Sequence, residues 1–531
     1  MKTWRLWLIT ASIFFTYSAL ILNIYNLQIK KGSIYAAKAV SQSRGVSYLN
    51  STRGTIYFTD KSGNEIPAVF NRQFPVIFAV PKDVEDPDEA ANALSSILNI
   101  AAGKIHLKPS TPNDQYELLS SKATNEQVSK VRALGLKGIY IDSEYFRFYP
   151  FANLASQVLG FVGQGSEDGA LTGRYGVEAY YEDSLGRDDV YLTIDRNIQA
   201  QAEKILKALI DKHGAEGGTV IVQVPKTGEI LAMGSFENFD PNAYADYPIR
   251  SFTNPAIQGV YEPGSVFKVL TMAAGIDSGK ITPTTKFYDS GSLTLNGKTI
   301  KNWDGKAHGN VTMTEVIEQS INTGASFAEK KTGHDIFYNY LLKFGFDDPT
   351  GITLPGELSG KLTNLKTATR DINFATAAFG QGVSVTPMQL INAVSAIAND
   401  GELMRPHIVK GLPAEKMNDV ISKESADLVT AMMVSAVDKA EIARINGYEI
   451  AGKTGTAQVP DFKRGGYGDQ YIHSYVGFGP ASDPKFSILM KIDKPKGASL
   501  AGSTVVPAFR ELAQFILNYY NIPADDLADK N

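Results

Sequence analysis

The segment Tyr261-Glu-Pro-Gly-Ser-Val-Phe-Lys268 places a serine and a lysine three residues apart. Proline and glycine precede a helix-compatible run, so we expect Ser265 at a helix N-terminus and Lys268 one turn along on the same face. A lysine held away from water can be neutral and can remove the proton of a neighbouring hydroxyl. Backbone N–H groups at a helix start can also stabilise an oxyanion. These features make Ser265 a candidate nucleophile, but a serine cap followed by an exposed lysine gives the same pattern.

Two further short motifs follow in order, Ser320-Ile-Asn322 and Lys453-Thr-Gly-Thr456. Each is common by itself, and so is the spacing of Ser265 and Lys268. Only Lys453 lies in an extended stretch, where a strand edge could offer backbone N–H groups and hydroxyls to a bound peptide. Further matches to the three patterns occur at Ser62-Gly-Asn64, Lys61-Ser-Gly, Lys226-Thr-Gly, Lys331-Thr-Gly and Ser482-Asp-Pro-Lys485.

The composition removes several other classes of site. The chain has no cysteine, which excludes disulfides, thiolate nucleophiles and cysteine-ligated metals. Its six histidines are scattered without a pair at the i, i+4 spacing of a helical zinc site, so we expect neither a metal nor a cofactor. Lysine and arginine total 52 against 56 acidic residues, without a cluster of positive charge. A nucleic-acid partner is therefore not expected.

The N-terminal segment predicts a membrane anchor. Residues 6–29 carry no charge, and a helix of that length would extend about 36 Å, enough to cross the hydrocarbon core of a bilayer. The run is too long for a typical signal peptide, so we expect it to stay uncleaved. The cations after residue 29 oppose a cytoplasmic N-terminus, but long domains are translocated largely regardless of flanking charge. We therefore predict a cytoplasmic head and an extracytoplasmic, periplasmic bulk.

The pattern after the anchor changes near residue 186. Residues between about 47 and 185 indicate short strands and helices, including a strand around residues 74–80 and a polar helix around residues 125–134. Asp195 is then a predicted N-cap for a helix that ends at Gly214. A β-hairpin follows around the turn Pro225-Lys-Thr-Gly228. A helix followed by a hairpin predicts a new α+β domain.

The ordered motifs S-x-x-K, S-x-N and K-T-G resemble those of penicillin-recognising serine acyltransferases. From about residue 47 to its end, the chain is similar to class B penicillin-binding proteins. The further segments that carry this similarity are Arg53-Gly-Thr-Ile with Asp60-Lys-Ser-Gly, Arg147-Phe-Tyr-Pro150, Gly176-Val-Glu-Ala-Tyr, Leu192-Thr-Ile-Asp-Arg-Asn-Ile-Gln199, Thr227-Gly-Glu-Ile-Leu-Ala-Met, Phe239-Asp-Pro-Asn242 and Gly380-Gln-Gly-Val-Ser-Val-Thr-Pro-Met-Gln389.

This resemblance implies a membrane-anchored peptidoglycan D,D-transpeptidase of the α+β class. The implied order is a cytoplasmic head (1–5), a transmembrane anchor (6–29), a pedestal domain (30–185), a transpeptidase domain with a β-lactamase-like fold (186–522) and a tail (523–531). The implied ligands are D-Ala-D-Ala stem peptides and β-lactam antibiotics. The same three motifs would also suit a β-lactamase, an antibiotic sensor or a carboxypeptidase, whereas a non-catalytic scaffold is opposed by the intact motifs.

The resemblance also implies roles for the motif residues. Ser265 would be the acyl-enzyme nucleophile, Lys268 its general base, Ser320 a proton shuttle, and Asn322 a ligand for the donor peptide backbone. Lys453 would supply positive potential opposite the serine. The residue between Ser320 and Asn322 is isoleucine, where the family often has a small polar residue, and this departure concerns fine specificity.

The strand after Lys453 would bind the substrate. The resemblance implies that Thr454, Gly455 and Thr456 line the donor peptide, with the two threonine hydroxyls on its terminal carboxylate. The oxyanion hole would consist of the backbone N–H groups of Ser265 and Thr456. Acyl transfer from an amide needs such donors at the developing oxyanion.

A nucleotide-binding alternative rests on one match. Gly447-Tyr-Glu-Ile-Ala-Gly-Lys-Thr454 satisfies the P-loop pattern in full. A P-loop follows a buried strand and opens a helix, whereas residues 439–446 are polar and Gly455 and Pro460 oppose a helix. The sequence also lacks the G-x-S-x-G pattern of lipases and esterases. We therefore disfavour both a P-loop NTPase and a lipase.

The choice within class B is between septal and lateral-wall synthesis. The run from Lys453 to Pro460 and the segment His473-Ser-Tyr-Val-Gly-Phe-Gly-Pro-Ala look more like the division branch. The sequence continues only about ten residues past Tyr520, so we expect no C-terminal PASTA modules. We predict a cell-division transpeptidase. The resemblance implies that its partners are a SEDS-family glycosyltransferase and other divisome membrane proteins.

Overall fold

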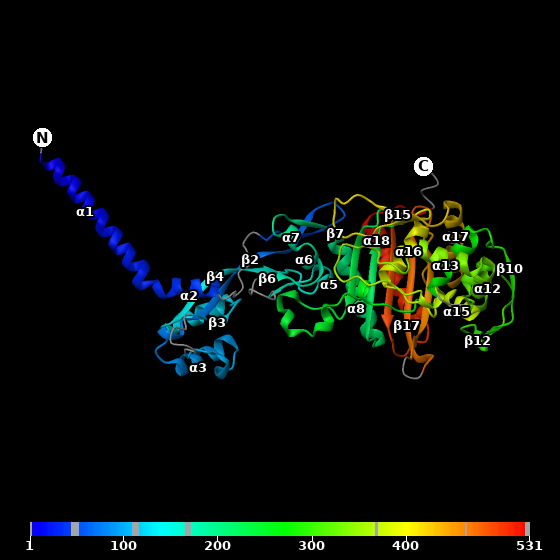
Figure 1. The fold of residues 1–531 in the computed structure, drawn as a ribbon, viewed down its shortest axis with the longest axis horizontal. Coiled ribbons are helices and arrows are strands. Elements are labelled where there is room, and N and C mark those ends of the chain that lie inside the picture. The colour runs from blue at the N-terminus through cyan, green and yellow to red at the C-terminus, as the bar shows by residue number, and fades with distance from the viewer. Residues whose placement is uncertain are drawn as a thin grey trace. The chain divides into compact units, whose positions relative to one another are not determined.

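The computed structural model describes residues 3–43, 53–108, 116–164, 171–366, 370–461 and 465–525 (Figure 1). Most of the predicted tail and the first two residues of the predicted head lie outside these ranges. The chain forms two compact units. The first contains residues 1–53, 70–148 and 162–172, and the second contains residues 54–69, 149–161 and 173–531. The predicted domain boundary at residue 186 stays a prediction.

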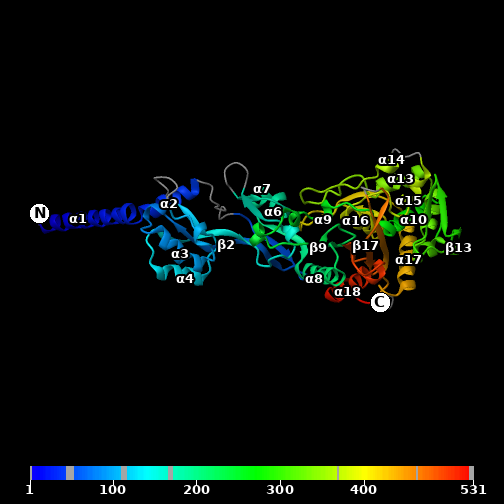
Figure 2. The ribbon, with the colours of Figure 1, turned by 90° about the horizontal axis from the view of Figure 1, so that it is seen from below.

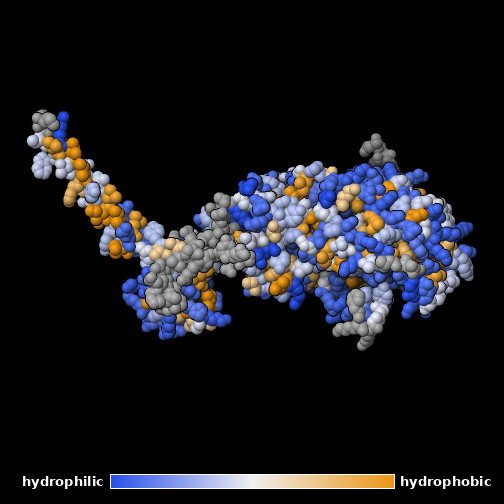
Figure 3. All heavy atoms as spheres, viewed as in Figure 1, coloured by the Kyte–Doolittle hydropathy of each residue, from blue (hydrophilic) through white to orange (hydrophobic). Residues whose placement is uncertain are grey.

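The N-terminal helix begins at Trp4. Helix α1 (Trp4–Tyr25) continues into the π-helical turn η1 (Asn26–Lys30), and α2 (Gly32–Ser43) follows. Its apolar side chains are exposed, and Figure 3 shows hydrophobic residues along its length. Within the described residues, this is the one helix long and apolar enough to cross a membrane. The prediction of a single N-terminal membrane anchor agrees with it.

The first unit is built around the later residues of β2 (Glu65–Ala79), which pair with β4 (Ile139–Phe148) and β3 (Glu117–Ser120). Helices α3 (Pro87–Leu98) and α4 (Asn125–Leu134) pack on this sheet through a small apolar core. The Thr124 hydroxyl begins α4 by accepting the N–H of Gln127 in a capping box. The predicted strand and polar helix of this region are confirmed.

The second unit contains a five-stranded antiparallel sheet in the order β16-β17-β18-β8-β9. Its strands are β8 (Gly217–Gln223), β9 (Ile230–Phe236), β16 (Ala451–Pro460), β17 (Tyr467–Gly479) and β18 (Phe486–Asp493). The β8–β9 pair is the predicted hairpin. Within the described residues β16 pairs with β17 alone, so its other edge is open to neighbouring segments.

The sheet is buried on both faces by helices. Residues alternate along β18, with Ile488 and Met490 in one core and Leu489 in the other. Helices α8 (Arg196–His213) and α18 (Val505–Tyr519) cover the first of these faces. The second is covered by α10 (Lys268–Asp277), α16 (Pro387–Ala398) and α17 (Lys423–Ala440), which can be followed in Figure 2.

Helix α8 begins as its sequence predicts. The Asp195 carboxylate accepts the N–H groups of Asn197 and Ile198 at 2.8 and 3.1 Å. Gly214 ends the helix in the left-handed region at φ +53°.

The Glu203 carboxylate lies in the middle of α8 and accepts the N–H of Ala155 at 2.7 Å. Burial raises the pKa of Glu203 to about 7. With its antiparallel sheet flanked by helices, the second unit confirms the predicted α+β fold class.

The remaining elements lie around these two sheets. Near the start of the second unit, β1 (Ile56–Thr59) pairs with the first residues of β2 and with β7 (Val190–Asp195). The other strands are β5 (Val162–Gln164), β6 (Leu171–Gly173), β10 (Lys286–Asp289), β11 (Ser292–Leu295), β12 (Lys298–Lys301), β13 (Gly309–Thr312), β14 (Glu402–Met404) and β15 (Lys416–Asp419). The other α-helices are α5 (Ser156–Leu159), α6 (Gly176–Tyr180), α7 (Glu182–Leu185), α9 (Pro255–Gln258), α11 (Met313–Glu318), α12 (Asn322–Thr332), α13 (His334–Lys343), α14 (Thr363–Lys366) and α15 (Asp371–Ala377).

Candidate active site

Ser265 lies in a short 3-10 turn, η6 (Gly264–Phe267), that leads directly into α10. Lys268 is the first residue of α10 and is fully buried. The sequence prediction of a serine at a helix start, with the lysine one turn along, is therefore confirmed. Ser265 itself is half-buried, so its hydroxyl can be reached by a substrate.

Two glycines let η6 pack against the edge strand β16. Gly264 has φ +63°, and a Cβ at this position would lie 3.0 Å from the Cβ of Ala457. A Cβ at Gly455 would lie 2.6 Å from Cγ2 of Val266 and 2.9 Å from the Pro263 carbonyl oxygen. The structure thus gives Gly455 a packing role beside the turn that carries Ser265. Its predicted contact with substrate stays a prediction.

The Lys268 amine is surrounded by neutral oxygens. Its Nζ lies 2.6 Å from the Ser320 carbonyl oxygen, 2.8 Å from Oδ1 of Asn322 and 3.2 Å from Oγ of Ser320. Burial, together with the nearby charge of Lys453, lowers the pKa of Lys268 well below its usual value. A neutral amine donates two hydrogens, which the carbonyl and amide oxygens can accept. Its lone pair is then free to act as a base.

Ser320 stands between two lysines. Nζ of Lys453 lies 3.0 Å from Oγ of Ser320, and it also contacts the carbonyl and hydroxyl oxygens of Thr454 at 3.2 and 3.3 Å. Burial lowers the pKa of Lys453 to about 7. The Ser320 hydroxyl can accept from one amine and donate to the other when the latter is neutral. This geometry suits the predicted proton shuttle.

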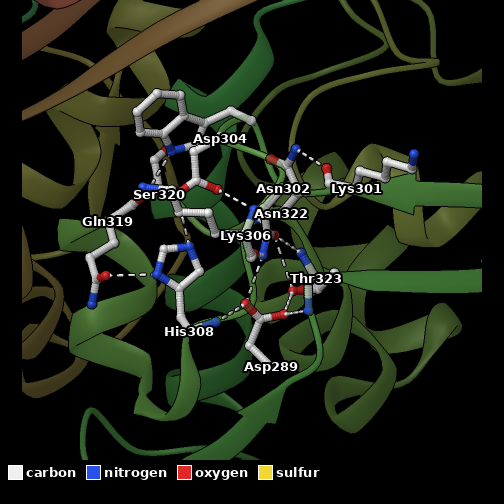
Figure 4. A network of polar contacts seen from close by, with 12 residues as sticks. Asp289, Lys301, Asn302, Asp304, Lys306, His308, Gln319, Ser320, Asn322 and Thr323 are labelled. Atoms are coloured by element: carbon white, nitrogen blue, oxygen red, sulfur yellow. Dashed lines mark hydrogen bonds and ion pairs between the residues drawn. The ribbon is translucent and has the colours of Figure 1, made fainter.

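The backbone around Ser320 is strained and must be held in place. Ser320 has φ +56°, an unfavourable conformation for a residue with a side chain. Helix α12 begins two residues later, and its N-cap residue Ile321 provides no side-chain cap. Asn302 supplies one from a distant loop, since its Oδ1 accepts the N–H groups of Asn322 and Thr323 at 3.1 and 3.3 Å (Figure 4).

Asp289 in turn holds Asn302. Its carboxylate accepts from Nδ2 of Asn302 and from the Thr323 hydroxyl, both at 2.7 Å, and from the N–H groups of Gly291 and His308. Burial raises the pKa of Asp289, but these hydrogen bonds outweigh it and hold the pKa below its usual value. Asp289 is therefore a buried, charged anchor for the turn that carries Ser320.

A second branch of this network fixes the residue before Ser320. The Trp303 indole N–H donates to the Gln319 carbonyl oxygen at 3.0 Å. In addition, His308 Nδ1 lies 2.9 Å from Oε1 of Gln319 (Figure 4). Sequence reasoning missed Asp289, Asn302 and Trp303. Their only local signal was a polar, glycine-containing loop without periodicity, which does not reveal a long-range cap.

The predicted donor-peptide ligand, Asn322, is already engaged within the chain. Its Oδ1 accepts from Lys268, and its Nδ2 donates to the Lys301 carbonyl oxygen at 2.9 Å. The structure thus places Asn322 in the site as a group that orients the Lys268 amine. The amide keeps a second N–H, so its contact with a donor peptide stays a prediction.

The residues before the nucleophile form another unpredicted contact. The Glu262 carboxylate accepts the Tyr467 hydroxyl of β17 at 2.9 Å and the N–H of Gly382 at 3.0 Å. Gly380 also accepts the N–H of Gly264 at 3.1 Å. The 380–389 segment, noted in the sequence for its resemblance alone, therefore supports the serine turn.

The nucleotide-binding alternative is wrong. Lys453 and Thr454 lie inside β16, which runs without interruption through Thr456, and no helix opens after them in that part of the described chain. A P-loop needs a loop and a helix N-terminus at this point. The side chain of Lys453 instead points to Ser320.

Two family models match the chain. The penicillin binding protein transpeptidase domain matches residues 218–514, and the penicillin-binding protein dimerisation domain matches residues 48–222. The chain belongs to the penicillin-binding proteins. With the relatives below, these matches confirm the predicted resemblance to class B penicillin-binding proteins and give the chain a serine-type D,D-transpeptidase domain.

Relatives of this penicillin-binding protein cover most of its length. The stage V sporulation protein D of Bacillus subtilis is 33% identical over 490 residues, which cover 83% of this chain and 75% of that protein. The peptidoglycan D,D-transpeptidase FtsI of Escherichia coli is 28% identical over 565 residues, covering 100% of this chain and 94% of that protein. The crystal structure of penicillin binding protein 3 from Mycobacterium tuberculosis, complexed with aztreonam, has a TM-score of 0.70 and 25% identity, and covers 89% of this chain and 97% of that chain.

Removal of the Asn302 cap should slow the penicillin-binding reaction. We expect Asn302→Ala to decrease the rate at which Ser265 reacts with a fluorescent penicillin by about tenfold or more, because a lost cap costs about 1–2 kcal/mol and frees the Ser320 turn. The rate constant is measured from gel fluorescence against time. Asn310→Ala, an exposed asparagine on the adjacent strand β13, is the matched control and should react at the wild-type rate. A folded Asn302→Ala protein with the wild-type rate would contradict the positioning role.

Proposed function

We propose that this penicillin-binding protein cross-links peptidoglycan stem peptides in septal wall synthesis through an acyl-enzyme on Ser265. The observation that carries the proposal is the pair of buried lysine amines that share the Ser320 hydroxyl beside the serine turn. A neutral Lys268 can serve as the base, and Lys453 can attract a carboxylate. Together they match the needs of acyl transfer from a D-Ala-D-Ala peptide.

The first half-reaction forms the acyl-enzyme. Lys268 takes the proton of Ser265 as Oγ attacks the carbonyl carbon of the penultimate D-Ala. The oxyanion accepts hydrogen bonds from the backbone N–H groups of Ser265 and Thr456. The C–N bond then breaks, and the departing amine of the terminal D-Ala receives a proton from Lys268 by way of Ser320.

The second half-reaction forms the cross-link. The amine of an acceptor stem peptide attacks the ester carbonyl and gives a proton to Lys268. Collapse of the tetrahedral intermediate breaks the ester bond, and Ser265 recovers its proton from Lys268. In a carboxypeptidase or β-lactamase, water would take the place of the acceptor amine.

Lys453 and its strand bind the terminal carboxylate of the donor. Because burial brings the pKa of Lys453 to about 7, an approaching carboxylate favours the charged amine. The hydroxyls of Thr454 and Thr456 lie on the same strand, are both half-buried and can donate to the same carboxylate. A β-lactam carries an equivalent carboxylate, so it occupies this position as an antibiotic.

Fluorescent penicillin should label the purified protein stoichiometrically at Ser265. Mass spectrometry of the tryptic digest should place the adduct on the peptide that contains this serine. Ser265→Ala should abolish labelling, and Lys268→Ala should nearly do so because the base is lost. Lys453→Ala should slow acylation but leave the serine reactive. The exposed, ion-paired Lys226 of another Lys-Thr-Gly sequence is the matched control, and Lys226→Ala should label normally.

Two outcomes would overturn this assignment. Rapid loss of the label, with release of the hydrolysed antibiotic, would identify a β-lactamase. Stoichiometric labelling that survives Ser265→Ala would place the nucleophile on another residue.

The septal role rests on motifs and relatives. The run from Lys453 to Pro460, the sequence Gly465-Gly-Tyr467 and the segment that begins at His473 are similar to the division branch. The FtsI relative matches the chain from end to end. Depletion of the protein in its native cell should give filaments of normal width without septa. Swollen or rounded cells would indicate the alternative, lateral-wall synthesis, and normal division with defective spores would indicate a sporulation role.

We also propose that the anchor helix binds a SEDS-family glycosyltransferase of the divisome, with its N-terminus in the cytoplasm and the catalytic unit outside. Small or polar side chains recur along one face of α1 and at its end, and such residues form interhelical contacts in lipid. They are Ser12, Thr16, Ala19, Asn23 and Asn26. The Thr16 hydroxyl is satisfied within the helix by the Ser12 carbonyl oxygen at 2.8 Å. The two asparagines add side-chain amides that can donate on this face.

Replacement of these asparagines should weaken the complex. We expect the double variant Asn23→Leu, Asn26→Leu to reduce co-purification of the glycosyltransferase by about fivefold or more, the loss of roughly 1 kcal/mol of interhelical hydrogen bonding. Ser18→Leu changes a polar residue on another face of α1 and should leave recovery unchanged. Equal recovery with all three proteins would contradict this interface.

A further inference from the structure

We infer that His473 is a positioning residue that holds the Thr456 hydroxyl in the orientation needed to bind the substrate carboxylate. The inference rests on the proposed function, which places that carboxylate at Thr456. His473 lies in the middle of β17, fully buried, and it pairs in register with Thr456 on β16. Cross-strand partners lie on the same face of a sheet.

A path of three hydrogen bonds connects the two side chains. Nδ1 of His473 lies 3.0 Å from the Thr504 hydroxyl, and this hydroxyl lies 3.2 Å from the Ala501 carbonyl oxygen. The N–H of Ala501 donates to the Thr456 hydroxyl oxygen at 3.2 Å. The path therefore runs through the turn η7 (Ala501–Ser503), which connects β18 to α18.

The direction of each hydrogen bond follows from the groups present. The Ala501 carbonyl can only accept, so the Thr504 hydroxyl donates to it and accepts from His473 Nδ1–H. The Thr456 oxygen accepts from Ala501 and keeps its own proton free. That proton can be donated to a ligand carboxylate. Burial and the neighbouring His213 lower the pKa of His473 to about 4, so the imidazole is neutral at physiological pH.

Within the described part of the chain, the other ring nitrogen provides no hydrogen bond that would account for a histidine at this position. Nε2 of His473 is buried without a hydrogen-bond partner among the described residues. An unsatisfied buried polar atom costs free energy that an apolar side chain of similar size would avoid. Neighbouring core positions on this face, such as Tyr475 and Met490, are filled by residues that pack against α8 and α18. The benefit of a histidine here therefore comes from its Nδ1–H.

This arrangement predicts that loss of the path affects some ligands and not others. If the path orients the Thr456 proton, its loss should weaken the reaction only with ligands that carry the carboxylate. A residue that merely filled the core would change the reaction of every ligand equally. Benzylpenicillin and its methyl ester provide this comparison, because they differ only in whether the carboxylate is free.

The experiment measures the second-order rate of acylation of the full chain in detergent by these two compounds. His473→Leu should slow the reaction with benzylpenicillin by about tenfold, the loss expected for one hydrogen bond to a charged group, and leave the methyl ester within about twofold. His473→Asn, whose amide N–H can replace Nδ1–H, should restore the wild-type ratio. Thr504→Val should reproduce the selective loss, and Thr504→Ser, which retains the hydroxyl, should not. In a Thr456→Val protein, His473→Leu should add no further loss.

Three results would overturn the inference. The first is an equal decrease in the acylation rate of His473→Leu with both compounds. The second is an unchanged rate of Thr504→Val with benzylpenicillin. The third is a full additional decrease in rate when His473→Leu is introduced into the Thr456→Val protein. If His473→Leu does not fold, the Thr504 pair still decides between the two interpretations. Failure of the proposed function would be distinct, because the wild-type protein would then react with neither compound, or would hydrolyse benzylpenicillin and release the product.

Discussion

The dehydration of two lysine amines around one serine hydroxyl is the interaction on which the rest of the site depends. Lys268 is 0% exposed and Lys453 is 3% exposed, and their hydrogen-bond partners in the structure are neutral oxygens. Burial disfavours the charged form of each amine, and each charge disfavours the other. A carboxylate in this place would stabilise the ammonium form and remove the base. The site therefore uses amides, carbonyls and hydroxyls to hold its lysines.

Burial of two amines side by side costs free energy of folding, and contacts from distant segments hold them in place. The nucleophile turn, the start of α12 and the edge strand β16 are separated by more than a hundred residues in sequence at their extremes, yet they converge on Ser320. Glycines at 264 and 455 allow η6 and β16 to approach closely. The Asp289–Asn302 pair holds the strained Ser320 turn, and it does so through main-chain N–H groups that any sequence would present. The residues of the candidate site are thus placed by groups that lie outside it.

Local patterns predicted the local parts of this structure. The N-cap Asp195, the hairpin of β8 and β9, the helix from Asn125 and the serine turn all depend on residues close in sequence, and they were predicted. The long-range contacts that support the site were not predicted. Asn302 caps a helix twenty residues away, and Tyr467 reaches Glu262 across two hundred residues. The contact partners of such residues are set by topology, which a single sequence shows only through a family resemblance.

The repeated Lys-Thr-Gly sequence shows why a motif acquires chemistry only from its place in the fold. Lys226 lies in the turn after β8, where its side chain is 58% exposed and pairs with Asp483 at 2.6 Å. Lys331 lies in the last turn of α12, where its amine lies over the Phe327 ring. Only Lys453 lies within a strand that carries its amine into the protein, next to Ser320 and, among the described residues, without a carboxylate partner. The same three residues form a solvated turn, a helix end and a buried amine in the candidate site because water reaches the first two amines and is excluded from the third.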